Sequence, residues 1–279
     1  MNLFWVYDIP SVVFANLVMA SFIVVALIGQ RLSRRWVKRV AGNDGEYNDL
    51  VATTLATVGV FFGITLGLIS VGAWQNFADV NVNVNQEVSA INVLYRSVSL
   101  YPEPNNNELR KNLKEYVYFV INEEWPAQRK GIVPKSGTDK VTAFQKNLYA
   151  YEPISESMKS VHAETISTFN EMIKLRRIRL QSVITGLPET LWLVIIFGSL
   201  LNIIIPWFLV YDRQFIQDLM IVLMAATIGL LVFLMAAMDY PFRGEFSVSP
   251  DSFVLMYERM NFRWNNLLTI SFSLQHQII

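Results

Sequence analysis

Apolar and polar residues alternate along the chain in long blocks, and four apolar blocks are each about as long as a membrane crossing. They cover residues 10–29, 50–74, 187–210 and 215–238. A helix needs about 20 predominantly apolar residues to cross the hydrocarbon core. The first two blocks carry no charged residue, and the other two carry Glu189 and Asp218 only near an edge. The pattern therefore predicts four transmembrane helices in two pairs.

The segment between the two pairs is a long insert with helical periodicity. Within residues 75–186, apolar positions at helical spacing predict helices over about 83–98, 108–124 and 154–181. The last of these is expected to run directly into the third crossing. The remaining residues, 241–279, form an extramembrane tail with one expected helix over about 252–267. The predicted fold class is an all-α integral membrane protein with four transmembrane helices and one long extramembrane helical insert.

Composition narrows the possible functions. The chain is 53% hydrophobic and 16% charged, and its 23 Lys and Arg balance its 23 Asp and Glu. A neutral chain gives no electrostatic reason to bind nucleic acid. The four apolar blocks make the lipid bilayer the expected surrounding. The absence of cysteine excludes disulfides and thiolate metal sites, and two distant histidines disfavour a His-based metal site. No cofactor is implied, and no enzyme motif is present.

The charges that flank the crossings leave the side of the insert open. A basic cluster, Arg31 to Arg39, follows the first crossing, which we interpret as a retained anchor. Short loops rich in Lys and Arg stay cytoplasmic, whereas long loops translocate largely regardless of charge. This rule places both termini and the insert outside. However, Lys174, Arg176, Arg177 and Arg179 precede the third crossing and nearly balance that count.

The second crossing carries three glycines, Gly59, Gly63 and Gly67, at every fourth position. Small residues at this spacing let two helices approach closely in lipid, where tight packing replaces the hydrophobic effect. The glycines could therefore pack this helix within one subunit, or pack it around the axis of an oligomer. The sequence supports both interpretations.

An apolar stripe runs beside the glycines, with Phe62, Leu66 and Ile69 at positions i, i+4 and i+7 and Ser70 next to it. In a channel such a stripe can form a constriction that gates by dewetting. In a helical bundle it is ordinary core or lipid-facing surface. The same helix carries hydroxyl groups at Thr57, Thr65 and Ser70. Because the crossings contain almost no ionisable residue, a proton relay or an ion-coupled pump is disfavoured.

Three polar residues are candidates for a vestibule or for a structural role. Asp239 lies at the end of the fourth crossing, before Pro241 and Gly244, and could recruit ions or cap a helix-end turn. Glu124 follows Glu123, and paired carboxylates can bind a hard cation, although adjacent helical residues point apart. Arg177 belongs to a basic run that could pair with these acids. From the sequence alone, whether any of these acidic residues binds a metal ion stays open.

Taken together, these motifs resemble the bestrophin-like domain-of-unknown-function family over roughly residues 51–253. The resemblance rests on Gly59-Val-Phe-Phe-Gly-Ile-Thr-Leu-Gly67, Glu124-Trp125-Pro126, Arg176-Arg-Ile-Arg-Leu180 and Asp239-Tyr-Pro-Phe-Arg-Gly244. Tyr240 departs from the family pattern, because His is expected at this position as often as Tyr. The family occurs in bacteria and plants, so the resemblance implies a bacterial inner (plasma) membrane.

The resemblance also implies a function. It suggests a distant likeness to bestrophins, which are pentameric ion channels whose second helix forms an apolar neck. By position, Phe62, Leu66 and either Ile69 or Ser70 would be neck residues, and the insert would lie in the cytosol, against the charge rule. The sequence therefore favours a passive homo-oligomeric channel for inorganic ions. The alternative is a non-conducting scaffold or sensor whose insert binds a partner.

Overall fold

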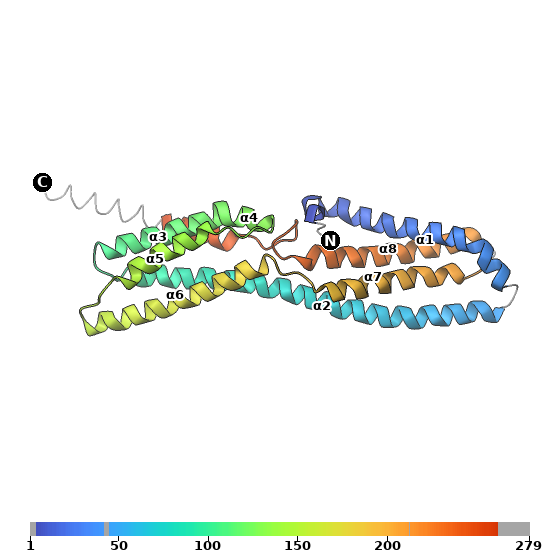
Figure 1. Ribbon diagram of the computed structural model, residues 1–279, viewed down its shortest axis with the longest axis horizontal. Coiled ribbons are helices and arrows are strands. Elements are labelled where there is room, and N and C mark those ends of the chain that lie inside the picture. The colour runs from blue at the N-terminus through green and yellow to red at the C-terminus, as the bar shows by residue number, and fades with distance from the viewer. Residues whose placement is uncertain (1–3, 42–44, 212, 262–279) are drawn as a thin grey trace. The chain divides into compact units, whose positions relative to one another are not determined.

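The computed structural model describes residues 4–41, 45–211 and 213–261, and these residues form helices and connecting loops without a strand. Four long helices are α1 (Ser11–Ala41), α2 (Gly45–Val98), α7 (Glu189–Ile204) and α8 (Gln214–Asp239) (Figure 1). Each is long and apolar enough to cross a membrane, α7 together with the 3₁₀ turn η3 (Ile205–Phe208). The predicted all-α class with four membrane-crossing helices is confirmed.

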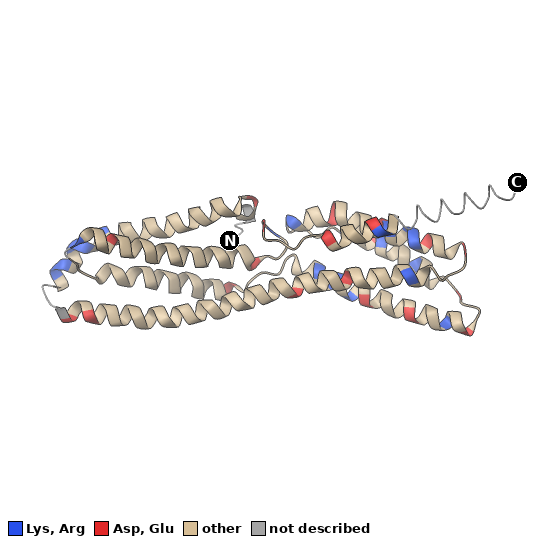
Figure 2. Ribbon diagram, turned by 180° about the vertical axis from the view of Figure 1, so that it is seen from behind, with Lys and Arg blue, Asp and Glu red and all other residues tan. Residues whose placement is uncertain are grey.

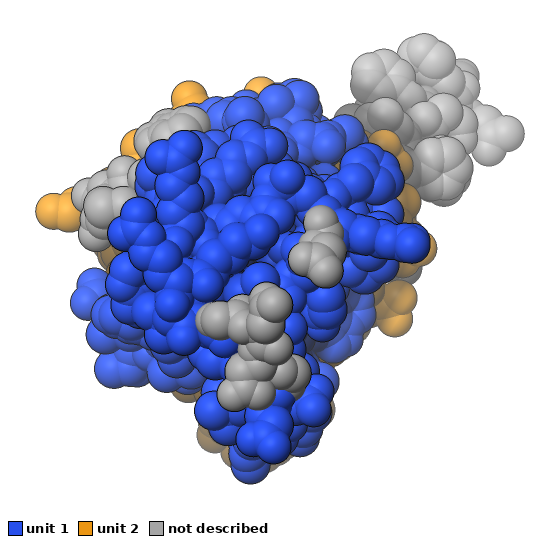
Figure 3. All heavy atoms as spheres, turned by 90° about the vertical axis from the view of Figure 1, so that its right-hand side faces the viewer, with its two compact units in different colours: residues 1–77, 186–246 blue, residues 78–185, 247–279 orange. Residues whose placement is uncertain are grey.

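The chain divides into two compact units, which Figure 3 colours separately. Unit 1 comprises residues 1–77 and 186–246, and unit 2 comprises residues 78–185 and 247–279. Charged residues are scarce along the crossing helices of unit 1, apart from a basic group at the C-terminal end of α1 (Figure 2). This distribution is the one expected of helices that lie in lipid.

Unit 1 is a bundle of α1, α7, α8 and the first part of α2. Its core is apolar and includes Ala26 of α1, Ile195 of α7, Ala225 of α8 and Leu66 of α2. Among the described helices, α1 and α8 pack against each other most extensively, and Gly229 of α8 allows a close approach. A Cβ atom at position 229 would lie 2.9 Å from the Cα atom of Met19. Backbone therefore meets backbone at this crossing, as is common between membrane helices.

Unit 2 is built from the rest of α2 and the helices of the insert. These helices are α3 (Asn105–Phe119), α4 (Trp125–Arg129), α5 (Ser136–Tyr149) and α6 (Glu156–Ser182), with a π-helical turn η2 (Val120–Glu124) between α3 and α4. Residues 251–261 add a further helical segment. The core of unit 2 includes aromatic side chains in contact, such as Phe144 against Phe169, whose rings are tilted by 40° with centroids 5.4 Å apart.

Two helix boundaries differ from those expected. The second crossing and the first insert helix are a single helix, α2, because residues 75–83 contain neither proline nor glycine to interrupt it. The long insert helix does not run into the third crossing, since α6 ends at Ser182 and α7 begins at Glu189. Pro188 disfavours helical backbone at Leu187, which explains this break. Of the tail helix expected over 252–267, residues 262–267 lie outside the described part.

The α1–α8 crossing yields a test of the bundle. Replacing Gly229 by Val places a branched side chain against the backbone of α1, and such overpacking costs about 1–3 kcal/mol. We expect a lower thermal unfolding midpoint in detergent. Gly72→Val is the matched control, because a Cβ atom at that helical glycine meets nothing within 4 Å. Equal midpoints for the two variants would contradict the close approach.

Candidate pore helix and buried charge cluster

The apolar stripe proposed from the sequence faces the interior of the subunit's own bundle. Leu66 is only 2% exposed and belongs to the core of unit 1. Phe62 lies against Gly198 of α7, where any side chain would collide with its ring. Ile69 is partly buried against the same core. The Ser70 hydroxyl donates to the Leu66 carbonyl at 2.8 Å and lies 3.7 Å from the Met235 sulfur. A pore-lining role for this stripe stays a prediction.

The three glycines of α2 do not share one environment. A Cβ atom at Gly59 would lie 3.4 Å from the Asn202 side-chain oxygen, so Gly59 faces α7. At Gly63, Gly67 and also Gly72, a Cβ atom would meet nothing within 4 Å. Gly63 and Gly67 therefore do not pack α2 within its own subunit. The interpretation that remains for these two is an approach by something outside the subunit.

The exposed side of α2 combines bulky apolar residues with hydroxyl groups. Its apolar residues are 59–70% exposed and comprise Val60, Phe61, Ile64, Leu68, Val71 and Trp74. The hydroxyls of Thr57 and Thr65 each donate to the carbonyl four residues earlier, at 2.9 and 2.8 Å. These donors are thus satisfied within the helix, and their oxygens can still accept a hydrogen bond.

Asp239 has a structural setting at the junction of α7 and α8. Its carboxylate accepts hydrogen bonds from the Leu187 backbone N–H, at 2.5 Å, and from the Trp192 indole N–H, at 3.1 Å. A Cβ atom at Gly186 would lie 2.7 Å from the same carboxylate. The side chain is 7% exposed, so it ties the start of α7 to the end of α8. This matches the helix-end interpretation of the Asp239 motif.

Unit 2 contains a buried charge cluster, formed by Glu87, Tyr116, Glu124, Arg176 and Arg179. Arg179 is fully buried and donates to Glu87 at 2.7 and 3.1 Å and to Glu124 at 3.0 Å. Arg176 donates to the second oxygen of Glu124 at 3.0 Å. The Tyr116 hydroxyl donates to Glu87 at 2.9 Å. Two acids and two guanidinium groups balance in charge, as a buried ionic cluster requires.

The protonation states of the cluster follow from its surroundings. Burial raises the pKa of the Tyr116 hydroxyl well above its usual range, and the negative charge of Glu87 raises it further. Tyr116 therefore stays a hydrogen-bond donor. Burial alone would lower the pKa of Arg179, but Glu87, Tyr116 and Glu124 together raise it well above its usual range. The guanidinium remains charged, and it lies over the Trp125 and Phe253 rings at 5.7 and 5.5 Å from their centroids.

The structure corrects the basic residue chosen from the sequence. Arg177 is exposed, whereas Arg176 and Arg179 share the buried face of α6. Residues three apart on a helix lie on one side, and the residue between them points away. Arg176 and Arg179 are two of the four cations before the third crossing that were counted against the Arg31–Arg39 cluster in assigning the topology. Their charges are neutralised by the buried acids Glu87 and Glu124.

Glu87 was missed by sequence reasoning although a signal was present. It lies on the same side of α2 as Val84 and Ile91, which are both buried. A lone acid in an apolar helical stripe indicates a buried partner, because an unpaired charge is too costly to bury.

The turn η2 sets the direction of Glu124. Pro126 has no backbone N–H and so breaks the regular helical ladder. The Trp125 N–H bonds instead to the Val120 carbonyl, five residues back, in a π-helical turn. Glu124 is turned into the core and Glu123 stays exposed, so the two acids do not form one site. Among the described residues, no group of three His, Asp or Glu could hold a metal ion.

Residues 20–253 match the Bestrophin-like domain. The chain belongs to the bestrophin-like family. The resemblance seen in the sequence motifs is confirmed, and the chain is an integral membrane protein. No protein among the curated sequences matches it.

Solved structures share the bestrophin-like fold. A substituted form of a bacterial bestrophin homologue from Klebsiella pneumoniae is 11% identical with a TM-score of 0.64, over 88% of this chain and 97% of that one. Another structure of that homologue is 12% identical with a TM-score of 0.63, over 88% and 96%. A structure described as a membrane protein is 13% identical with a TM-score of 0.61, over 90% and 97%. At this identity the likeness establishes the fold.

The charge cluster of this bestrophin-like chain yields a sharp prediction. Arg179→Met leaves two buried carboxylates without their main partner, which costs about 3–5 kcal/mol. We expect backbone amides of α6 to exchange hydrogen at least a hundredfold faster, because exchange reports the free energy of local opening. Arg177→Met, one helical step away and exposed, is the control and should leave exchange unchanged. Similar protection in both variants would rule out the cluster as a stabilising core.

Proposed function

We propose that the protein is a homo-oligomeric ion channel in which the exposed face of α2 lines the conducting path. Membership of the bestrophin-like family and the shared fold support this class of function. The single observation that carries it is the composition of that face. It combines glycines that meet nothing in their own subunit with hydroxyls and a row of bulky apolar side chains. We propose no catalytic role.

The glycines supply the reason to assemble. All four crossing helices expose apolar surface, which lipid alone could cover. Gly63 and Gly67 differ, because small residues at this spacing favour the close approach of a second helix in lipid. Homo-oligomers usually have closed rotational symmetry. When three or more subunits assemble in this way, a ring of α2 helices can enclose an axial path. The proposed partner at this face is therefore another copy of the chain.

The constriction moves to neighbouring residues of α2. A pore wall consists of side chains that each subunit leaves exposed, and Leu66 is buried in its own bundle. Ile64 and Leu68 lie one turn apart on the exposed side and are 59% and 70% exposed. Rings of such residues form a hydrophobic constriction that can close by dewetting. In this proposal Phe62, Leu66, Ile69 and Ser70 support the wall from behind.

The absence of charge on this part of α2 favours passive conduction. Between Asp49 and Asp79 the helix carries no ionisable residue. Ion-coupled and proton-coupled transporters usually need such residues within the membrane. Thr57 and Thr65 are also exposed, and their side-chain oxygens can accept a hydrogen bond from water or lie against a cation.

The first test is ion flux into liposomes that contain the purified protein, with potassium and chloride gradients measured separately. The double variant Ile64→Ala with Leu68→Ala should raise flux, because it widens the proposed constriction on an exposed face. The matched double variant, Phe62→Ala with Leu66→Ala, should instead lower the free energy of unfolding. Truncation of the buried Leu66 alone should cost about 2–5 kcal/mol, because it leaves a cavity in the core.

The two pairs separate the possible outcomes. Raised flux only from the Phe62 and Leu66 pair, in folded oligomers, would place the constriction on the inner stripe. No flux of either ion from wild type or from the Ile64 and Leu68 pair, in protein shown to be oligomeric, would contradict a channel. The scaffold or sensor role would then be favoured.

A second test uses the absence of native cysteine. Gly67→Cys introduces a single thiol on the proposed oligomer face. We expect a short bifunctional maleimide to link pairs of neighbouring subunits through their single thiols, giving covalent dimers on a denaturing gel. Phe197→Cys is the control, since residue 197 is 63% exposed on α7 and lies outside the proposed axis. Equal cross-linking at both positions, or none at residue 67, would argue against a central α2.

A further inference from the structure

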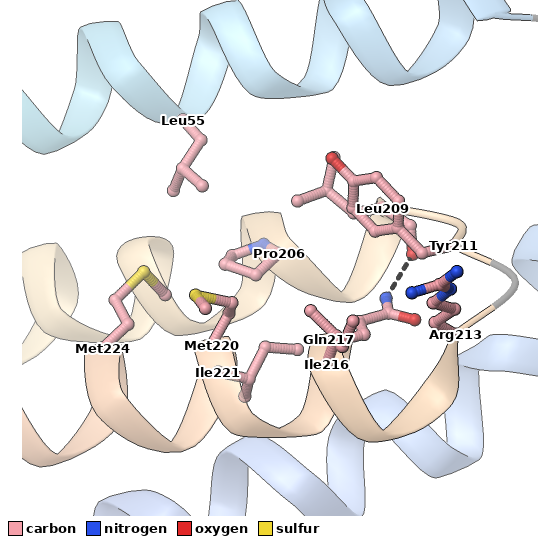
Figure 4. A pocket seen from close by; sticks show the side chains of 10 residues that line it. All are labelled: Leu55, Pro206, Leu209, Tyr211, Arg213, Ile216, Gln217, Met220, Ile221 and Met224. Atoms are coloured by element: carbon pink, nitrogen blue, oxygen red, sulfur yellow. Dashed lines mark hydrogen bonds between the residues drawn. The ribbon is translucent and has the colours of Figure 1, made fainter.

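Unit 1 contains a cavity that no part of the proposed conduction path uses. It lies between the N-terminal part of α2 and the start of α8, with a volume of about 650 Å³ (Figure 4). Leu55 forms the α2 side, and Pro206 of η3 closes another side. The volume falls within the roughly 300–1,000 Å³ typical of small-ligand sites.

The cavity is polar at one end and apolar along the rest. Figure 4 shows Tyr211 and Arg213 together at the start of α8, and Met220 and Met224 further along that helix. Gln217 lies between them and donates to the Leu209 carbonyl at 2.6 Å, so its amide is partly used within the protein. Among the described residues that line the cavity, Arg213 alone is charged. A ligand with one anionic end and a long apolar part fits this gradient.

The length of the cavity matches the depth of one leaflet. Arg213 and Met224 are separated by 11 positions of helical rise, which is about 16 Å. Half of a hydrocarbon core is about 15 Å thick. Because α8 crosses the membrane, Arg213 lies at headgroup level and the two methionines lie at the depth of acyl chains. Methionine is flexible and polarisable, so it can adapt to an alkyl chain.

The same end of the bundle is strongly basic. The loop before α8 meets the end of α1, where Arg34 and Lys38 line a small hollow beside Leu209 and Gln217. The Arg31–Arg39 cluster therefore lies at the same membrane surface as Arg213. Such a surface concentrates anionic lipids from the adjoining leaflet.

We propose that the cavity binds an anionic phospholipid, with its phosphate at Arg213 and one acyl chain along Met220 and Met224 beneath Leu55. The proposal does not depend on ion conduction. The site would hold a lipid between α2 and α8, where an acyl chain fills the space that the two helices leave open.

The test measures lipid binding to the full-length protein in detergent by native mass spectrometry. Phosphatidylglycerol and phosphatidylcholine with the same acyl chains are added separately. Wild type should bind phosphatidylglycerol more tightly. Arg213→Gln should weaken that binding about fivefold, the effect of one basic contact at an anionic surface. It should weaken phosphatidylcholine less, because the choline group already offsets the charge of that lipid's phosphate. Met224→Trp should weaken both lipids by filling the apolar part.

Two control variants make the same kinds of substitution at residues that do not line the cavity. Arg35→Gln removes an exposed cation at the same end of α1 without touching the cavity. Leu223→Trp adds the same bulk one position earlier on α8, on a side chain that is 54% exposed. Both should bind lipid as wild type does.

Three results would overturn the proposal. The first is equal binding by Arg213→Gln and Arg35→Gln, which would mean a diffuse surface effect. The second is full competition by soluble glycerol phosphate, which would mean a site for a free anion. The third is a change of oligomer size in Met224→Trp with no change in lipid binding, which would mean that a second copy fills the cavity.

Discussion

The unbroken helix α2 is the element on which both units depend. A bilayer offers no hydrogen-bond partner to exposed backbone, so a crossing segment must satisfy its own N–H and C=O groups. Helix α2 does so over 54 residues, from Gly45 to Val98. Its first part adds Leu66 to the core of unit 1, and its last part supplies Glu87 to the charge cluster of unit 2. One continuous series of backbone hydrogen bonds therefore spans the apolar core of unit 1 and the buried charge cluster of unit 2.

The motifs that identify the family stabilise junctions in the fold. Glu124 and the two buried arginines of the Arg176–Leu180 motif meet in the charge cluster. The Asp239 carboxylate accepts hydrogen bonds from the Leu187 backbone N–H and from the Trp192 indole N–H, near the start of α7. Each contact needs one residue type at one place, since a buried charge without its partner is costly. Apolar positions in lipid face weaker demands, which is consistent with a shared fold at 11–13% identity.

The crossings could be predicted from the sequence because burial in lipid imposes a simple rule of length and polarity. The faces of the helices could not. Phe62 and Leu66 resemble a pore stripe in the sequence, but a core and a dry constriction use the same side chains. Only the position of α7, with Gly198 opposite Phe62, distinguishes them. Arg177 was chosen over Arg176 and Arg179 for the same reason, since these three cations within one helical turn differ mainly in direction around the helix.

The membrane part of α2 thus has two sides with different partners. Leu55 and Leu66, about three turns apart, lie on one side, Leu66 in the subunit's own core and Leu55 at the cavity beside α8. Ile64 and Leu68 lie on the exposed side with Gly67. A helix that only anchored the insert would need one buried stripe and an otherwise uniform apolar surface. The glycines would then weaken α2 by about 1 kcal/mol each relative to alanine, without any compensating contact. A second helix at this face supplies that contact, and this argument favours assembly over a simple anchor.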